Sequence, residues 1–113
     1  MSSGDNTSPY ENIIVPIKIG KSAKENWELI DQSDGDWTWV HLQSFPSCHV
    51  IIECKNPSQH MIKHAGYLCK MNTKYKNVPN IKIAYCLVKN LNKGEKTGEV
   101  YFKSNRQVKE FKI

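Results

Sequence analysis

Residues 37–54 decide the fold, and they read WTWVHLQSFPSCHVIIEC. From Trp37 to Leu42 the side chains alternate between two faces, as in a β-strand, and His49 to Cys54 is a second β-rich run. Residues 44–47 break the pattern between them. Both faces of the first strand carry large side chains, so we expect both to be largely buried, with Trp39 as a core residue.

On the N-terminal side, residues 13–19 predict another strand. Pro16 places it at a sheet edge or in a bulge, because proline cannot donate a ladder hydrogen bond. The residues that follow have the form of a capping box, in which Ser22 accepts from the third helical amide and Glu25 returns a bond to the Ser22 amide. A short helix should begin here and end near Ile30.

On the C-terminal side, the sequence predicts the main helix. Residues 56–58 form a helix start with proline near the first helical position, and the helix is expected over about residues 58–74. Gly66 weakens it and marks close packing. The apolar residues of this segment follow the i, i+3, i+4, i+7 spacing of a helix that lies on a sheet: Met61, Ile62, Ala65, Leu68 and Cys69.

Ile81–Val88 has the strongest strand pattern in the chain. Residues 92–98 are expected to form a polar loop, and residues 100–102 to pair with residues 108–113 in a closing hairpin around Ser104–Asn105. Strands dominate and do not alternate regularly with helices. The sequence therefore predicts an α+β fold, with a curved, mostly antiparallel β-sheet packed against one main helix plus a short N-terminal helix.

The 113 residues allow one domain. Residues 1–9 are polar and should form a disordered tail, which leaves residues 10–113 for the domain. The longest apolar runs are too short for a membrane span or a signal-peptide core, so we expect a cytoplasmic protein with reduced thiols. Its cysteines lack zinc-ribbon spacing and are predicted to be small core residues: Cys48, Cys54, Cys69 and Cys86.

Charge is divided unequally along the chain. Residues 1–53 carry three Lys and eight acids, net −5, whereas residues 54–113 carry twelve Lys and Arg106 against three acids, net +10. Such a basic half favours a polyanionic partner. The main helix concentrates the charge on one stripe, where lysines can bind phosphates and a tyrosine can stack a base, although an ordinary solvated face has the same pattern. The stripe consists of Lys63, Tyr67, Lys70 and Lys74.

Two other motifs are incomplete. Gly20-Lys21-Ser22 is similar to the end of a P-loop, but Val15 stands where that motif needs a glycine, which argues against an NTPase. The same turn either contacts a phosphate at the helix N-terminus or is an ordinary turn. His60 and His64 have metalloprotease spacing without the catalytic glutamate, so we expect two solvated histidines, no metal and no cofactor.

Ordered motifs over roughly residues 13–113 resemble the NFACT-R domain family. The most specific is a tryptophan and a histidine two residues apart, with a second histidine eight residues further on. The family usually has an acid two residues before the tryptophan, whereas this chain has Trp37 there and Asp36 one place earlier. The motif residues that match are Gly20, Glu25, Trp39, His41 and His49.

The resemblance implies an RNA-binding module, because the longest family members carry this domain in ribosome quality control factors. We therefore expect sequence-tolerant binding to ribosomal RNA or tRNA, linked to translation or ribosome quality control, with the ribosome as a candidate partner. A DNA-binding domain is the alternative. The residues expected to bind nucleic acid are Lys21, Asn26, His49, Lys63, Tyr67, Lys70, Lys74, Lys89 and Lys93.

The competing interpretation is an enzyme that acts on a nucleotide or a phosphoester. Glu25, Asn26, His41 and His49 would then form a polar pocket near Gly20, in which histidine and carboxylate supply acid–base catalysis. No nucleophile or metal set accompanies these residues, and structural histidines satisfied by hydrogen bonds explain them equally. The sequence alone does not separate structural from binding roles for the two histidines.

Overall fold

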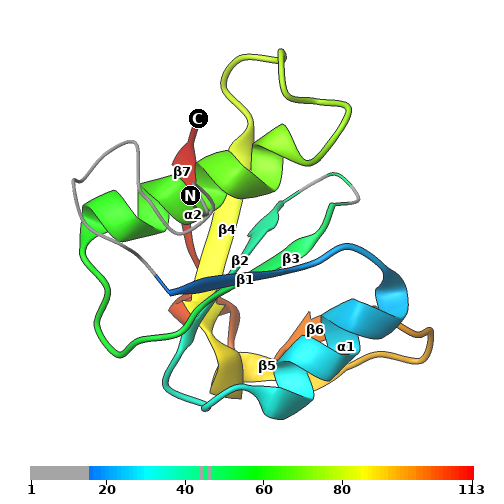
Figure 1. Ribbon diagram of the computed structural model, residues 1–113. Coiled ribbons are helices and arrows are strands. Elements are labelled where there is room, and N and C mark those ends of the chain that lie inside the picture. The colour runs from blue at the N-terminus through cyan, green and yellow to red at the C-terminus, as the bar shows by residue number, and fades with distance from the viewer. Residues whose placement is uncertain (1–15, 44, 46) are drawn as a thin grey trace.

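The computed structural model describes residues 16–43, 45 and 47–113 (Figure 1). Residues 1–15, which include the expected tail and the start of the first expected strand, lie outside the described residues. Short 3-10 helices follow β4 and β6, at η2 (Val88–Asn90) and η3 (Asn105–Gln107). The other elements are β1 (Ile17–Gly20), α1 (Ala23–Gln32), β2 (Thr38–Leu42), β3 (His49–Ile52), α2 (Gln59–Met71), β4 (Lys82–Leu87), β5 (Leu91–Lys93), β6 (Val100–Phe102) and β7 (Lys109–Lys112).

The main sheet has the strand order β1-β3-β2-β4-β7, and every neighbouring pair is antiparallel. β1 lies at one edge, as Pro16 predicted, and the Pro16 carbonyl accepts a hydrogen bond of 2.8 Å from the Glu53 amide. In the middle of the sheet, Val40 pairs with Val50 on one side and Tyr85 on the other. The predicted α+β class with a mostly antiparallel sheet is confirmed.

The predicted closing hairpin is wrong. β6 pairs with β5, so that Phe102 lies opposite Leu91, and β7 pairs with β4, so that Phe111 lies opposite Ile83. The physical reason is that Phe102 and Phe111 pack into different apolar clusters, on opposite faces of the main sheet. Local alternation in the sequence does not say which cluster a strand joins.

Asn90 fixes the path of the chain between β6 and β7. The Asn90 side chain donates to the Ser104 carbonyl at 2.9 Å and accepts from the Ser104 amide at 2.9 Å. The Lys103 amide donates to the Asn90 carbonyl at 2.8 Å. Because these bonds hold the chain after β6 against η2, β7 is free to leave the hairpin and join the main sheet.

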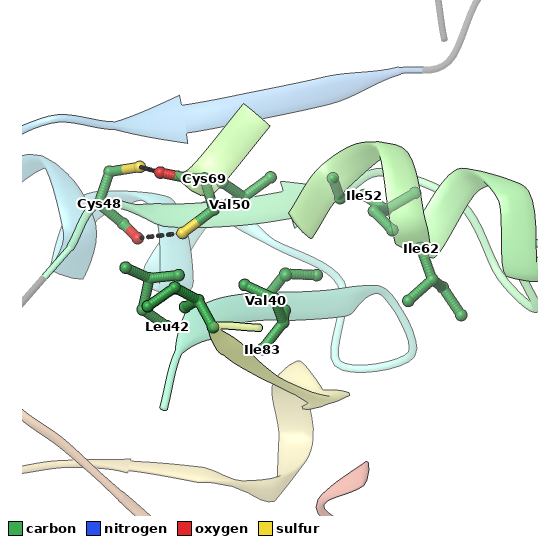
Figure 2. Packing of buried hydrophobic residues seen from close by; sticks show 10 residues of the cluster. Val40, Leu42, Cys48, Val50, Ile52, Ile62, Cys69 and Ile83 are labelled. Atoms are coloured by element: carbon green, nitrogen blue, oxygen red, sulfur yellow. Dashed lines mark hydrogen bonds between the residues drawn. The ribbon is translucent and has the colours of Figure 1, made fainter. Parts of the chain in front are cut away.

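α2 covers one face of the main sheet, as predicted. Ile62, Ala65 and Cys69 on the helix belong to one buried cluster with strand residues such as Val40 and Ile83 (Figure 2). Gly66 allows the close approach, since a Cβ there would lie 2.6 Å from Phe111 Cζ. The helix begins after Ser58, whose side chain accepts from the Met61 amide at 3.2 Å, so Pro57 precedes the N-cap.

The opposite face is covered by α1 and the β5–β6 hairpin, which lie together at the lower end of the molecule in Figure 1. Trp39, Ile51, Cys86, Val88 and Leu91 form the buried cluster on this side. Trp39 is 2% exposed, so its predicted place in the core is confirmed. Both faces of β2 are therefore buried, and the two helices lie on opposite sides of the sheet.

α1 begins as predicted, with a difference in its cap. The Ser22 side chain accepts from the Glu25 amide at 3.1 Å, but the Glu25 carboxylate accepts from the Lys21 amide at 2.9 Å and not from the Ser22 amide. The Glu25 carboxylate therefore bonds to the amide of Lys21, which is one residue before the N-cap Ser22. No helix in the described part of the chain is long and apolar enough to cross a membrane.

Candidate nucleic-acid interface

Trp39, His41 and His49 form one aromatic cluster on the α1 side of the sheet. Trp39 and His41 are two residues apart on β2, and their rings stack with centroids 5.3 Å apart and planes inclined by 9°. His49, on neighbouring β3, meets His41 edge-on at 5.0 Å and Trp39 edge-on at 5.3 Å. Strand pairing therefore explains why these three motif residues lie together.

Asn26 joins this cluster to α1. Its Oδ1 accepts a hydrogen bond from the His49 amide at 3.1 Å, and the side chain is buried. Gly20 leaves the room for this contact, because a Cβ at that position would lie 2.5 Å from Asn26 Oδ1. Gly20, Asn26 and His49 are thus one packing unit, which draws the start of α1 against the start of β3.

A cavity of about 340 Å³ opens at this junction. It brings together three of the predicted binding residues, Lys21, Asn26 and His49, with the motif residue His41. The far wall comes from the loop between β5 and β6, more than 70 residues away from Lys21 in the sequence. The complete lining is Lys21, Ser22, Ala23, Asn26, His41, Ser47, Cys48, His49, Thr97 and Gly98.

Two contacts hold the loop between β5 and β6, which forms the far wall of the cavity, against α1. Trp27 Nε1 donates to the Glu99 carbonyl at 2.9 Å. Gly98 has φ +90, and a Cβ there would lie 2.8 Å from the Ala23 Cβ. Thr97 and Gly98 were not predicted as site residues, because only the folded chain brings this loop to the helix start. Gly98 lies in a segment that resembles the family, and this was the only feature of the sequence that could have indicated it as a site residue.

The imidazoles of the cavity are neutral at physiological pH. Burial, together with the neighbouring His41, lowers the pKa of His49 to about 3. Burial also lowers the pKa of His41. Positive charge at the cavity therefore comes from exposed Lys21 and from the N-terminus of α1. The site combines a cationic rim with a neutral aromatic interior.

The pocket that the competing enzyme interpretation requires is only partly assembled. Asn26, His41 and His49 line the cavity, but Glu25 is a helix-cap residue whose carboxylate accepts from the Lys21 amide. Cys48 also lines the cavity, and the neighbouring Cys69 thiol and its own burial raise the pKa of its thiol. Figure 2 shows the reciprocal contacts in which each of these thiols donates to the main-chain carbonyl of the other residue. The thiol is thus held in its protonated form, which is a poor nucleophile.

The cysteine prediction is confirmed for three of the four residues. Cys48, Cys69 and Cys86 are buried, whereas Cys54 is half-buried. In the described residues, no group of three or more His, Cys, Asp or Glu could hold a metal ion.

The predicted stripe lies across the sheet from the cavity, but only part of it is on α2. The helix was expected to reach about residue 74 and ends at Met71, so Lys74 lies in the turn that follows. Lys63 and Lys74 are exposed, and Tyr67 is 36% exposed. Lys74 lies over the Tyr75 ring at 5.6 Å. Lys70 departs from the expected solvated face: it is 8% exposed, and its Nζ donates to the main-chain oxygen of Ile113 at 3.0 Å. The stripe therefore presents fewer free cations than its spacing predicts.

His64 is a second departure on this helix. It was expected to be solvated, but it is 1% exposed, and neither ring nitrogen has a hydrogen-bond partner among the described residues. Burial lowers its pKa, so the ring is neutral. The i, i+4 spacing with His60 did not reveal that His64 faces inward.

Lys89 and Lys93 lie on the α1 side of the molecule and pair with acids of the N-terminal half. Lys89 Nζ is 3.0 Å from Asp36, and Lys93 Nζ is 2.7 Å from Asp31. Lys93 also lies over the Trp27 ring at 5.1 Å. These ion pairs partly neutralise the opposite net charges of the N-terminal and C-terminal halves of the chain.

The fold and the site together define a small α+β module with a cation-rimmed cavity at a helix N-terminus. Residues 9–104 match the family described as the NFACT protein RNA binding domain. The chain belongs to this family, as its motifs predicted. A comparison with curated proteins finds no match.

Among solved structures, the chain is similar to the C-terminal part of the fibronectin/fibrinogen-binding protein from Streptococcus suis. The TM-score is 0.77 at 25% sequence identity, over 86% of this chain. This chain spans 39% of the length of that solved chain. The likeness extends the family assignment to a shared three-dimensional fold.

Proposed function

We propose that the chain is a sequence-tolerant RNA-binding module that acts on ribosomal RNA or tRNA, in translation or ribosome quality control in the cytoplasm. The observation that carries the proposal is the cavity at the N-terminus of α1. There, Lys21 and a helix start lie beside the predicted binding residue Asn26 and the motif residue His49. Helix N-termini and lysines both bind phosphate, and the family supplies RNA as the nucleic acid.

Cations outside the cavity extend this surface. Lys89 and Lys93 lie on the same side of the sheet as α1, and each pairs with one exposed or half-exposed carboxylate. Such surface pairs contribute only about 0–1 kcal/mol, so a phosphate can replace the carboxylate at small cost. Lys63 on α2 and Lys74 in the turn after it supply a separate basic area. The cavity is the primary contact in this proposal, and the other lysines add affinity without reading bases.

A salt titration tests the proposal on structured RNA, single-stranded RNA and duplex DNA. With about four to six phosphates engaged, the slope of log affinity against log salt should be roughly −3 to −4 on single strands. Tighter binding to RNA than to duplex DNA at each salt concentration is the expected result. A flat salt response would exclude phosphate contact, and tighter binding to the duplex would replace RNA with DNA as the ligand.

A further inference from the structure

We propose that the cavity holds one unstacked nucleotide of the bound RNA, with its phosphate at Lys21 and the start of α1 and its base against His41 and His49. The inference rests on the proposed function and adds what the cavity contacts. The cavity volume of about 340 Å³ lies at the lower end of the ~300–1,000 Å³ range of small-molecule sites. It suits one nucleotide and not a helical segment.

The phosphate end follows from the cap of α1. Of the first-turn amides, the Glu25 amide donates to Ser22 Oγ and the Asn26 amide to the Ser22 carbonyl. The Ala23 and Lys24 amides precede the first intrahelical bond, and Ala23 lines the cavity. α1 is ten residues long, which is long enough for an ordered positive end. Lys21 adds a full charge at the same rim.

The inner wall carries an unsatisfied polar ring. His49 is 3% exposed and lines the cavity, and its Nδ1 has no hydrogen-bond partner among the described residues. Buried polar atoms without partners are rare in native proteins and cost about 1–3 kcal/mol each. The Nδ1 atom itself is buried, so a base edge would supply the missing partner once the ring turns to present this atom to the cavity. This ring belongs to β3 and not to the helix, so it is an observation separate from the helix start.

Two further side chains suit a base and not a bare anion. His41 stacks on Trp39 with parallel planes, which leaves a rigid and neutral ring at the cavity. Bases displayed by single strands stack on such rings and bond along their edges. Asn26 uses Oδ1 for the His49 amide, so its Nδ2 is the end available as a donor to a ligand. The interior thus offers stacking and edge contacts, and the rim offers charge.

The test uses the full chain and four probes: adenosine 5′-monophosphate, uridine 5′-monophosphate, adenosine and inorganic phosphate. Binding is followed by amide and imidazole nitrogen NMR. Both nucleotides should shift the Ala23 and Gly98 amides together with the ring signals of His41 and His49. Phosphate alone should shift the helix-start amides and leave the imidazole signals in place, and adenosine should bind at least about fivefold more weakly than the nucleotide.

Lys21→Ala has a matched control in Lys24→Ala. Both lysines are exposed at the start of α1, but Lys24 is outside the cavity lining and lies 4.0 Å from Glu28. Lys21→Ala should weaken nucleotide binding about five- to tenfold, and Lys24→Ala less than about twofold. Equal losses, or shifts confined to α2, would overturn the nucleotide site. If RNA binds in the salt titration while no nucleotide reaches the cavity, the inference alone fails; if RNA does not bind, the proposed function fails.

Discussion

Lys70 shows how burial changes what a charged side chain does. Its position on α2 matches the basic stripe, yet its ammonium group donates to the Ile113 main-chain oxygen and the residue is buried. Ile113 in turn exchanges two main-chain hydrogen bonds with Ile81, at 2.9 and 3.0 Å. Lys70 therefore ties α2 to the paired segments beside β4 and β7.

We expect Lys70→Ala to lower the free energy of unfolding by about 2 kcal/mol, because a hydrogen bond from a charged donor and a packed stem are both lost. Lys70→Met, which keeps the stem, should lose less. The exposed Lys74→Ala is the control and should change stability by less than about 0.5 kcal/mol. Urea unfolding measures all three. Equal stabilities for the Lys70 and Lys74 variants would contradict the structural role of Lys70.

The buried imidazoles make stability depend on pH. His49 has a pKa of about 3 in the folded chain, below the value of about 6.5 expected when unfolded. Between these values the unfolded chain binds more protons than the folded chain, so stability falls as pH falls from about 6.5 to about 3. Each such group contributes a slope of up to about 1.4 kcal/mol per pH unit.

His49→Gln should remove one such contribution while retaining the main-chain bond to Asn26, since that bond uses the residue 49 amide. The difference in unfolding free energy between wild type and variant should therefore shrink as pH falls through the window. Urea unfolding at several pH values measures it. A difference that stays constant from pH 7 to pH 4 would mean that His49 titrates normally.

At the level of elements, the approach of α2 to the sheet depends on Gly66. Alanine normally stabilises a helix interior by about 1 kcal/mol relative to glycine. Here the added Cβ would lie 2.6 Å from Phe111 Cζ and 3.3 Å from Ile83 Cγ1, so the ring on β7 would have to move.

We expect Gly66→Ala to lower the melting temperature despite the gain in helix propensity. In a Phe111→Leu background, where the ring is absent, the same change should be neutral or stabilising. The double-mutant cycle isolates the clash from the general cost of truncating Phe111. A stabilising Gly66→Ala in the wild-type background would show that α2 does not pack as closely as described.

β4 is the element that should open least. It pairs with β2 on one side and β7 on the other, and both of its faces contribute buried residues to the apolar clusters. Native-state hydrogen exchange should therefore show the strongest protection in Lys82–Leu87 and its neighbour β2, with opening energies near the global value. The short β5–β6 pair should exchange faster. Faster exchange of β4 than of β5 would contradict the strand order.

At the level of the whole molecule, the predicted basic surface is divided by the sheet. Lys63 lies on α2 and Lys74 in the turn that follows it, whereas Lys21, Lys89 and Lys93 lie on the α1 side. Because α2 and the cavity lie on opposite sides of the main sheet, we expect that a short oligonucleotide that occupies the cavity does not also cover α2.

We expect Lys21→Ala to weaken binding of an RNA of about six nucleotides, while the double variant Lys63→Ala/Lys74→Ala leaves it within about twofold. On a long structured RNA, the double variant should instead reduce the salt slope by about 1 to 2, since each phosphate contact contributes about 0.7 to 0.9. Fluorescence anisotropy at several salt concentrations measures both. If the Lys63→Ala/Lys74→Ala variant lost binding to the short RNA, the primary site would lie at these two lysines and not at the cavity.

Short-range chemistry in the sequence determined most of the elements and the family of this protein. It did not predict β5, since residues 92 and 93 were expected in a loop. Alternation around Trp39, the Ser22 cap and the apolar spacing of α2 are properties of neighbouring residues, so they can be read without a fold. The motif residues from Gly20 to His49 were found in the same way, because their order along the chain carries the resemblance.

The tertiary structure alone decided which residues share a surface. Strand pairing placed β6 beside β5 and not beside β7, and this brought Thr97 and Gly98 to the start of α1. The packing of α2 on the sheet also buries Lys70 and His64, and the spacing of residues along a helix does not distinguish them from exposed neighbours. The reason is that burial and cavity shape arise from contacts between residues far apart in sequence, and these depend on which face of the sheet each element covers.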